Sequence, residues 1–366
     1  MSQLEIAYHS CVYATNNRSN CNNCETICPT DAIKMSETMP TFMPSLCVGC
    51  GGCVGACPTE AFSTDGFKPE EFTQSFLQAP ESIISCKTNI SCIGALNSEY
   101  LIAYALQKKE NIVLDLGHCS ECEWAQTLKP QIDKSIEEAN YFLQNSGETV
   151  AIISEDLKLG TIEEEEEQTL SRRALFSKEG LKGALKAKKA IKEKVDEEEG
   201  VYTKADHSGY NRSKIKEKAI PFRRQFFIES TRDLTPANFV SEFLQGEKLS
   251  FITDKKIDKK ACINCAICYN ICPTGSLHGD LFKGKIEFDF LYCVACGSCH
   301  DSCLYDAIHR EDEFSLLGFI EPKRKKLAKF FMRNCGDCGV FFKYDGDDFC
   351  PRCRDLDDES RELVGF

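Results

Sequence analysis

The stretch CVGCGGCVGACP, residues 47–58, decides the fold of the chain around it. Its cysteines follow the spacing C-x2-C-x2-C-x3-C-P. The two-residue gaps let one tight loop wrap three thiolates around a single centre, with its amide groups facing the sulfurs. The three-residue gap carries the fourth cysteine away at the start of a short helix. Gly49, Gly51 and Gly52 let the backbone come close to that centre.

The same spacing occurs twice more. It is complete in CINCAICYNICP (262–273), and Cys293 to Cys303 repeats it with Leu304 in place of the proline. A single C-x2-C pair suits zinc or redox thiols as well as iron. Three complete runs are instead typical of iron–sulfur clusters, and we expect each run to hold three ligands of one cluster and the fourth ligand of another.

A fourth run, near the N-terminus, is incomplete. Cys21, Cys24 and Cys28 keep the spacing, but Arg18 stands where the first cysteine belongs, and arginine has no lone pair to offer iron. The residues between Cys11 and Cys21 are rich in Asn, Ser and Thr, a composition typical of loops. We expect this loop to bring Cys11 back as the missing ligand, and a three-cysteine [3Fe–4S] site is the alternative.

All 24 cysteines can be assigned to groups of four, and two of these groups lie outside the runs. Cys86, Cys92, Cys119 and Cys122 form the first, for which an additional iron–sulfur cluster, zinc and unligated redox thiols all remain open. Cys335, Cys338, Cys350 and Cys353 form the second. Tetrahedral thiolate sites suit zinc or a single iron, and Val340 and Arg354 replace residues usual in rubredoxins, so zinc is favoured.

Each half of the chain, 1–66 and 250–312, resembles a bacterial two-[4Fe–4S] ferredoxin, and the chain as a whole resembles a polyferredoxin. The C-terminal cysteines resemble those of zinc ribbons and rubredoxins. In two-cluster ferredoxins the fourth cysteine of each run binds the other run's cluster. The resemblance therefore implies four [4Fe–4S] clusters, held by Cys11, Cys21, Cys24 and Cys57; by Cys28, Cys47, Cys50 and Cys53; by Cys262, Cys265, Cys268 and Cys303; and by Cys272, Cys293, Cys296 and Cys299.

The segment between the two halves predicts alternating strands and helices. Short apolar, β-branched runs and amphipathic stretches alternate over 82–86, 94–108, 111–119, 124–144 and 149–154. Alternating β and α elements favour a small parallel sheet. Cys86 and Cys119 both fall at the carboxyl ends of predicted strands, which meet at one edge of a parallel sheet.

The predicted fold class is α+β with several domains. Two ferredoxin-like modules flank a small α/β domain and a charged helical linker, and a zinc-ribbon-like tail follows. The boundaries are 1–66 for the first ferredoxin domain, 78–155 for the α/β domain, 156–220 for the linker, 221–315 for the second ferredoxin domain and 328–358 for the tail.

The composition limits the kinds of partner and the cellular location to be expected. The 366 residues include 57 acidic and 44 basic ones, giving a net charge of −13. This disfavours nucleic acid as a partner, because phosphate-binding proteins carry a basic surface. The first residues lack a secretory signal pattern, and no apolar stretch is long enough to span a membrane. With so many thiolate ligands, we expect a cytoplasmic protein.

No nucleotide-binding or catalytic motif is present, so the sequence predicts a non-catalytic protein, with the 78–155 domain left open. We expect an electron-transfer protein that relays electrons to or from a partner oxidoreductase. The alternative, from another class, is an assembly, maturation or regulatory accessory protein for a metalloenzyme, in which the clusters are cargo or sensors.

Overall fold

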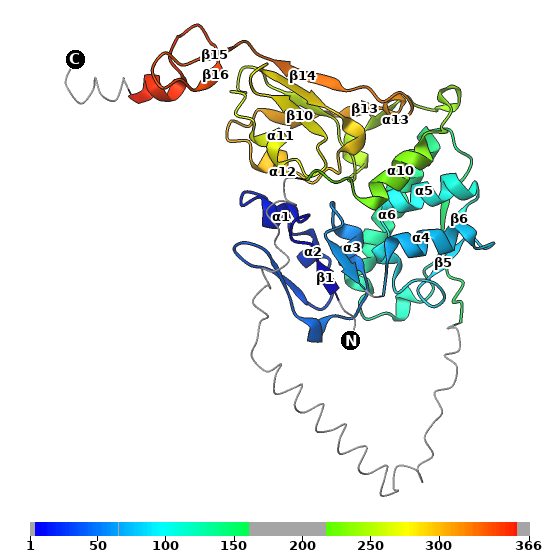
Figure 1. The fold of residues 1–366 in the computed structure, drawn as a ribbon. Helices are drawn as coiled ribbons and strands as arrows, with labels where there is room; N and C mark the ends of the chain where they lie inside the picture. Colours follow the sequence, from blue (N-terminus) through cyan, green and yellow to red (C-terminus); the bar gives the residue numbers. More distant parts are fainter. Residues whose placement is uncertain (1–3, 65, 161–216, 357–366) are drawn as a thin grey trace, which may run out of the picture.

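The computed structural model describes residues 4–64, 66–160 and 217–356 (Figure 1). The predicted charged helical linker, 156–220, lies for most of its length outside these residues. None of the described helices is long and apolar enough to cross a membrane.

The first cysteine module is built from short elements between its cysteines. Ile6 of the first strand pairs with Phe62 of the last in an antiparallel ladder, and a hairpin of β2 and β3 lies between the two cysteine runs. The elements are β1 (Leu4–Ile6), α1 (Val12–Thr15), α2 (Asn23–Thr26), β2 (Ile33–Met35), β3 (Pro40–Phe42), η1 (Pro44–Leu46), α3 (Gly52–Ala56) and β4 (Phe62–Thr64).

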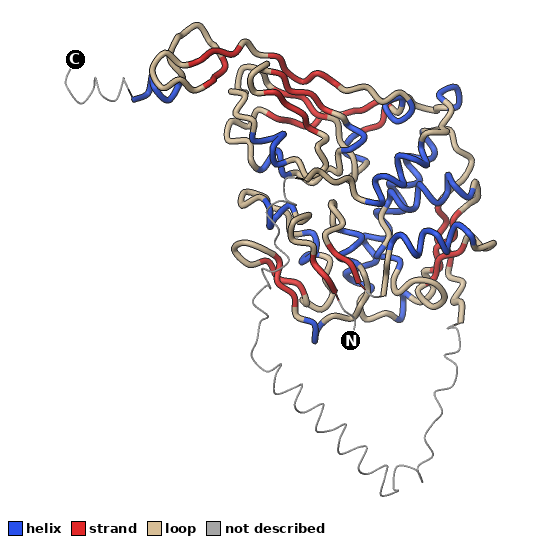
Figure 2. Tube along the Cα trace, viewed as in Figure 1, coloured by secondary structure: helices blue, strands red, loops and turns tan. Residues whose placement is uncertain are grey.

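The second cysteine module has the same order of elements, as the two ferredoxin-like halves of the sequence predict. Ile257 of β9 pairs with Ile308 of β12, and β10 and β11 form the hairpin between the runs. The strand β14 adds to β11, so this sheet has three strands, seen together in Figure 2. The elements are β9 (Lys255–Ile257), α11 (Ile267–Ile271), β10 (Leu277–Asp280), β11 (Lys285–Phe288), η7 (Phe290–Tyr292), α12 (Ser298–Asp301), β12 (Ile308–Arg310) and β14 (Lys325–Lys329).

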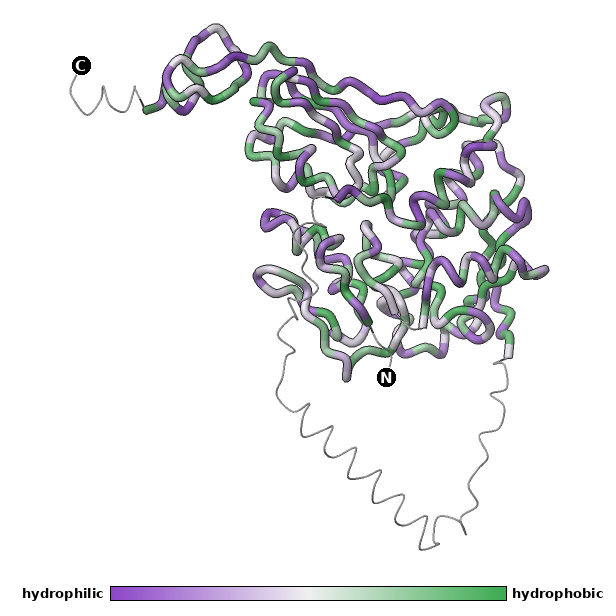
Figure 3. The backbone as a smooth tube through the Cα atoms, viewed as in Figure 1, coloured by the Kyte–Doolittle hydropathy of each residue, from purple (hydrophilic) through white to green (hydrophobic). Residues whose placement is uncertain are grey.

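The middle segment forms the predicted parallel sheet. The strands β5, β6 and β7 lie in that order and all run parallel, and Figure 3 shows green, hydrophobic stretches of backbone in this part of the fold. Isoleucine, valine and leucine dominate them because a parallel sheet is covered on both faces. The elements are α4 (Pro69–Gln78), β5 (Ile83–Ser85), η2 (Ile93–Ala95), α5 (Ser98–Lys108), β6 (Ile112–Asp115), η3 (Cys119–Glu121), α6 (Ala125–Asn145) and β7 (Ile152–Glu155).

The segment just before the second module packs on the middle segment. The helix α10 (Phe222–Thr231) lies against α5 (Figure 1), where Phe226 contacts Tyr104 with ring centroids 5.6 Å apart. The sequence placed these residues in the second ferredoxin domain. In the structure α10 packs on both sides: Phe226 faces the middle segment, and Phe227 contacts Phe251 and Phe319 of the second half, with ring centroids 5.4 and 5.5 Å apart. The chain continues through η5 (Pro236–Asn238), β8 (Phe243–Gln245) and η6 (Gly246–Lys248), and β8 pairs with β13 (Glu313–Ser315), which is followed by α13 (Leu317–Ile320).

A buried cluster of three charges joins the units. The Glu99 carboxylate of α5 binds Arg223 Nε at 3.0 Å and Arg224 Nε at 2.9 Å, and all three side chains are at most 3% exposed. Arg223 also donates to the carbonyls of Gly55 at 3.2 Å and Cys57 at 2.5 Å in the first module. Arg224 donates to the carbonyl of Phe251, which leads into the second module. One carboxylate thus supports contacts with both cysteine modules.

The C-terminal part of the described chain is a small hairpin, β15 (Met332–Asn334) and β16 (Phe341–Lys343). It is docked on the second module. Lys343 Nζ donates to the carbonyls of Lys259 at 2.6 Å and Cys262 at 3.0 Å, and Phe341 contacts Phe282 with ring centroids 5.4 Å apart. The hairpin therefore lies next to the loop that opens the 262–273 run.

We expect Glu99→Gln to lower the free energy of unfolding by about 3–5 kcal/mol, because it leaves two buried guanidinium groups without a counter-charge. Chemical denaturation followed by far-UV circular dichroism measures this change. Glu71→Gln is the matched control: Glu71 pairs with Lys68 at 3.1 Å, but that pair is exposed, and we expect a change within about 0.5 kcal/mol. Equal effects of the two substitutions would show that the buried cluster contributes nothing.

Candidate metal centres

The three complete cysteine runs share a backbone conformation that wraps each run around a centre. The residues immediately before and after the second cysteine are both left-handed in every complete run. These residues are Gly49 and Gly51, Asn264 and Ala266, and Ala295 and Gly297. Left-handed backbone at Ala or Asn costs energy, so its recurrence indicates a functional constraint. The incomplete run departs from this pattern, since Asn22 has a φ of −136°.

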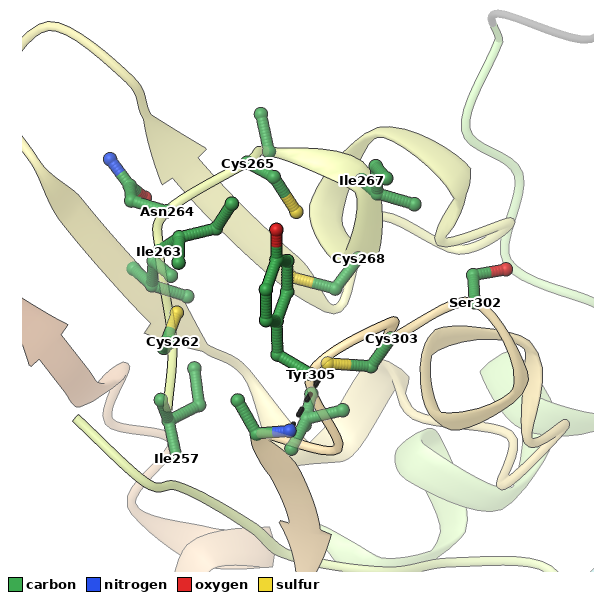
Figure 4. Close-up of a pocket in the computed structure, with 14 residues that line it drawn as sticks. Ile257, Cys262, Ile263, Asn264, Cys265, Ile267, Cys268, Ser302, Cys303 and Tyr305 are labelled. Atoms are coloured by element: carbon green, nitrogen blue, oxygen red, sulfur yellow. Dashed lines mark hydrogen bonds between the residues drawn. The ribbon is translucent and has the colours of Figure 1, made fainter. Parts of the chain in front are cut away.

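The quartet of Cys262, Cys265, Cys268 and Cys303 lines one cavity (Figure 4). Three of these cysteines come from one run and Cys303 comes from the end of the other, as the crossed arrangement predicts. Ile257, Ile263 and Ile286 line the same cavity, so the thiols face an apolar interior. The backbone N–H of Ala307 donates to Cys303 Sγ at 3.2 Å, which would stabilise negative charge on that sulfur.

Two other quartets are brought together in the same crossed way. Cys272 joins Cys293, Cys296 and Cys299 around a second cavity, whose walls include Leu277 and Phe288. A third cavity, with Ile33 and Phe42 in its walls, is lined by Cys28, Cys47, Cys50 and Cys53.

The structure also brings Cys11 to the incomplete run. Burial, together with the nearby thiols of Cys57, Cys11 and Cys21, raises the pKa of Cys24 to about 12. Cys11 is itself buried, and burial followed by the neighbouring Cys57 and Cys21 raises its pKa to about 11. Arg18 is exposed and replaces no ligand in space. Thiols with such raised pKa values stay protonated until a metal displaces the proton.

The two quartets within each module are neighbours. Cys53 of one quartet lies close enough to Cys24 of the other for each thiolate to disfavour the other's charge. In the second module, the Cys299 thiol likewise lies close enough to raise the pKa of Cys268. This closeness follows from the crossing, because the short helix after each third cysteine leads directly to the other quartet.

The loop between Cys11 and Cys21 joins the two modules. Asn16, which is buried, donates through Nδ2 to Ser298 Oγ at 2.8 Å and to Ser302 Oγ at 2.9 Å. Asn20 donates its backbone N–H to Asp301 at 2.9 Å. These partners belong to α12 and the residue that follows it. The loop before Cys21 in the first module therefore holds the helix that carries Cys299 in the second module. Next to these hydrogen bonds, Cys21 and Cys296 line one polar cleft of about 580 Å³.

The C-terminal quartet has a different spacing. The ligand atoms of Cys335, Cys338, Cys350 and Cys353 lie within 4.8 Å of one another, and the Sγ atoms of Cys338 and Cys350 are 3.7 Å apart. Four thiolates at about 2.3 Å from one tetrahedral ion are about 3.8 Å apart, so this quartet fits a single metal ion. Within the described parts of the chain, no other group of candidate ligands is packed so closely. The five other quartets do not meet this spacing.

Backbone donors prepare this C-terminal site for metal. The backbone N–H of Cys350 donates to Cys335 Sγ at 3.2 Å. This bond, with others from the same turn, lowers the pKa of Cys335 to about 6. A thiol with a lowered pKa is available as the thiolate that binds metal.

Sequence reasoning missed three threonines that contact the fourth cysteines. The hydroxyls of Thr30, Thr59 and Thr274 lie 3.7–3.8 Å from Cys28, Cys57 and Cys272 Sγ respectively. The signal was present in the sequence, since Cys-Pro-Thr occurs at all three places. In the fourth case, Cys303, the corresponding residue is Tyr305, which instead lines the cavity in Figure 4.

Two modules that each bring crossed cysteine quartets side by side define a protein with two dicluster iron–sulfur domains. Comparison with known families agrees. Residues 17–74 and 254–304 match families that are both described as 4Fe-4S dicluster domains. The chain belongs to the ferredoxins of this dicluster type.

Three curated relatives show the breadth of this likeness. Polyferredoxin protein MvhB of Methanothermus fervidus is 35% identical over 85 residues, covering 22% of this chain and 19% of MvhB. Pyruvate synthase subunit PorD of Methanothermobacter marburgensis is 37% identical over 57 residues, covering 16% and 64%. An uncharacterized ferredoxin of Methanocaldococcus jannaschii is 34% identical over 71 residues, covering 19% and 83%. The chain thus spans about a fifth of MvhB and less than two thirds of PorD.

We expect Thr59→Val to make the reduction potential of the centre at Cys57 more negative by roughly 20–60 mV. A hydroxyl that donates to a thiolate favours the more negative, reduced state, and its loss is worth about 0.5–1.5 kcal/mol for a one-electron couple. Potentiometric titration followed by electron paramagnetic resonance (EPR) measures the shift. Thr41→Val, at an exposed hydroxyl on β3 that bonds Lys34, should change no potential. A positive shift in Thr59→Val would contradict the assigned hydrogen bond.

Proposed function

We propose that this protein is a multi-cluster iron–sulfur electron carrier that exchanges electrons with a partner oxidoreductase in a reducing compartment, the cytoplasm. Four [4Fe–4S] clusters would be held by the four crossed quartets, including Cys11 with Cys21, Cys24 and Cys57. Such clusters supply reversible one-electron chemistry. The chain's own residues space the clusters, exclude water from them and hydrogen-bond their sulfurs.

One arrangement supports this proposal: each crossed quartet has another quartet as its neighbour, so that together they make a row. Within each module, the thiols of one quartet lie beside those of the other. Between the modules, Asn16 fastens the first module to α12, the helix that carries Cys299. The inner quartets, those containing Cys21 and Cys296, therefore face each other across one cleft. A row without a break suits a relay, whereas clusters carried as cargo need separate, exposed sites.

The relatives support the same reading. One is named a polyferredoxin and another a subunit of pyruvate synthase, so ferredoxin modules of this type serve as parts of oxidoreductases. We infer a partner protein of that kind for this chain. A net charge of −13 favours a basic docking surface on that partner, because complementary charge speeds the encounter.

The decisive measurement is the metal and acid-labile sulfide content of anaerobically purified full-length protein. We expect about sixteen irons with matching sulfide from four cubanes, and one tetrahedral metal at the C-terminal hairpin. EPR of the reduced protein should show interacting [4Fe–4S] signals, and partial reduction by a low-potential donor should be reversible. Fewer than twelve irons in fully loaded protein would contradict the four-cubane proposal. Rapid transfer of the clusters to an apo-protein would favour the assembly function.

We propose that the metal at Cys335, Cys338, Cys350 and Cys353 is zinc in a structural role. The close thiol spacing supports a single ion, and Val340 and Arg354 depart from the rubredoxin pattern. Cys350→Ser should remove about one zinc per chain and leave the iron and sulfide unchanged, and it should expose the 332–356 hairpin to proteolysis. Arg352→Ala, between the last two cysteines, is the control and should keep the zinc. Loss of one iron without sulfide from Cys350→Ser would instead show a rubredoxin-type site.

A further inference from the structure

The quartet in the middle segment lies at one edge of the parallel sheet. β5 ends at Ser85 and Cys86 follows it, while β6 ends at Asp115 and Cys119 opens the next turn. Ser85 and Asp115 are paired neighbours in parallel strands, so the two cysteine-bearing loops leave the sheet side by side. This edge is where open α/β sheets bind their ligands.

Buried polar side chains hold both loops in place before any metal binds. Asp115 is fully buried. Its carboxylate accepts from Ser85 Oγ at 2.9 Å and from the Gly117 N–H at 3.1 Å, which ties the second loop to the end of the first strand. Asn89 holds the first loop, accepting from the Ser85 N–H at 3.0 Å and donating to the Ile83 carbonyl at 2.8 Å. Loops fixed this way are typical of a preorganised ligand site.

The thiols of this quartet lie close enough together to affect one another's pKa. Burial, together with the nearby thiols of Cys50, Cys86 and Cys119, raises the pKa of Cys92 to about 12. Cys119 is influenced in turn by Cys86 and Cys122. The thiols are nevertheless further apart than those of the C-terminal quartet, which are the only ones in the described residues to meet a single-ion spacing. In this respect they resemble the crossed quartets of the two ferredoxin modules, which do not meet that spacing either.

The loop after Cys92 is in backbone contact with the first ferredoxin module. A Cβ atom at Gly55 would lie 2.6 Å from the carbonyl oxygen of Gly94, and one at Gly51 would lie 2.8 Å from Ala95 Cβ. Only glycine allows α3 to approach η2 this closely. Because Gly51 directly follows Cys50, this contact explains why the Cys92 and Cys50 thiols influence each other.

We propose that Cys86, Cys92, Cys119 and Cys122 bind a fifth iron–sulfur cluster, which lies next to the cluster of Cys50 and ends the row. This deepens the proposed electron-transfer function and rests on it. A single zinc does not suit the wide thiol spacing. Free redox thiols account for neither the four converging cysteines nor the glycine contact that draws them toward Cys50. Lys87 and Lys129, which favour the charged forms of Cys86 and Cys119, would offset the negative charge of a bound cluster.

Removal of one ligand tests the site. Cys122 is exposed, so Cys122→Ala leaves the packing intact. In anaerobically purified full-length protein we expect it to remove two irons with two sulfides, or four with four, and one EPR signal of the reduced protein, while about sixteen irons remain. Ser120→Ala, between Cys119 and Cys122, is the control and should keep every iron.

Other results for Cys122→Ala would overturn the proposal. Unchanged iron and sulfide would show free thiols, and loss of one zinc would show a mononuclear site. Cys119→Ser provides a second variant at the same site and should give the same loss of iron. A wild-type content below twelve irons would contradict the four-cubane function instead, so the two failures are distinguishable.

The position of the fifth cluster is tested separately. Gly55→Ala should push α3 away from η2 without removing a ligand, so iron and sulfide should stay at the wild-type value. The magnetic interaction between the fifth cluster and its neighbour, seen as faster spin relaxation in wild-type protein, should weaken. Gly66→Ala is the control, because its Cβ would meet its nearest neighbour, the Gly49 carbonyl oxygen, at an ordinary 3.5 Å. No interaction in wild-type protein, or an unchanged one in Gly55→Ala, would overturn the assigned position.

Discussion

The arrangement of the whole protein depends on the carboxylate of Glu99. It forms ion pairs with two buried guanidinium groups, and these hold backbone carbonyls at Gly55 and Cys57 in one module and at Phe251 before the other. A buried ion cluster of this kind adds little net stability compared with apolar packing, but removal of one partner leaves an uncompensated buried charge, which disfavours arrangements that separate the three side chains. Electron transfer needs fixed spacing between centres more than it needs extra stability. We therefore regard the Glu99 cluster as the element that keeps the cysteine quartets in register.

The row of quartets also bears on the choice between carrier and assembly protein. Cys24, Cys57 and Cys272 are buried, and the crossed pattern makes each quartet depend on both runs of its module. Release of one cluster would thus disturb its neighbour. An assembly protein benefits from independent, accessible sites, and a carrier benefits from coupled, enclosed ones. The geometry favours the carrier.

Much of the fold was predictable because it depends on local chemistry. The spacing from Cys47 to Cys57 dictates a loop around a cluster wherever it occurs, and the apolar runs at Ile83 and Ile112 predict strands of a parallel sheet. The contacts between units were not predictable in this way. Glu99 meets Arg223 across 124 positions of sequence, and Asn16 meets Ser298 across 282, and neither residue stands in a recognisable motif. Composition placed α10 in the second module for the same reason: nothing in its residues shows which surface its phenylalanines will meet.

Closure of the loop between Cys11 and Cys21 depends on contacts with the second module. Closing a longer loop costs more conformational entropy than closing the two-residue gaps of the other runs. The hydrogen bonds from Asn16 and Asn20 to α12 offset part of that cost, but only once α12 has formed in the second module. The closed loop that brings Cys11 to Cys21 is therefore stabilised fully only when both modules are folded.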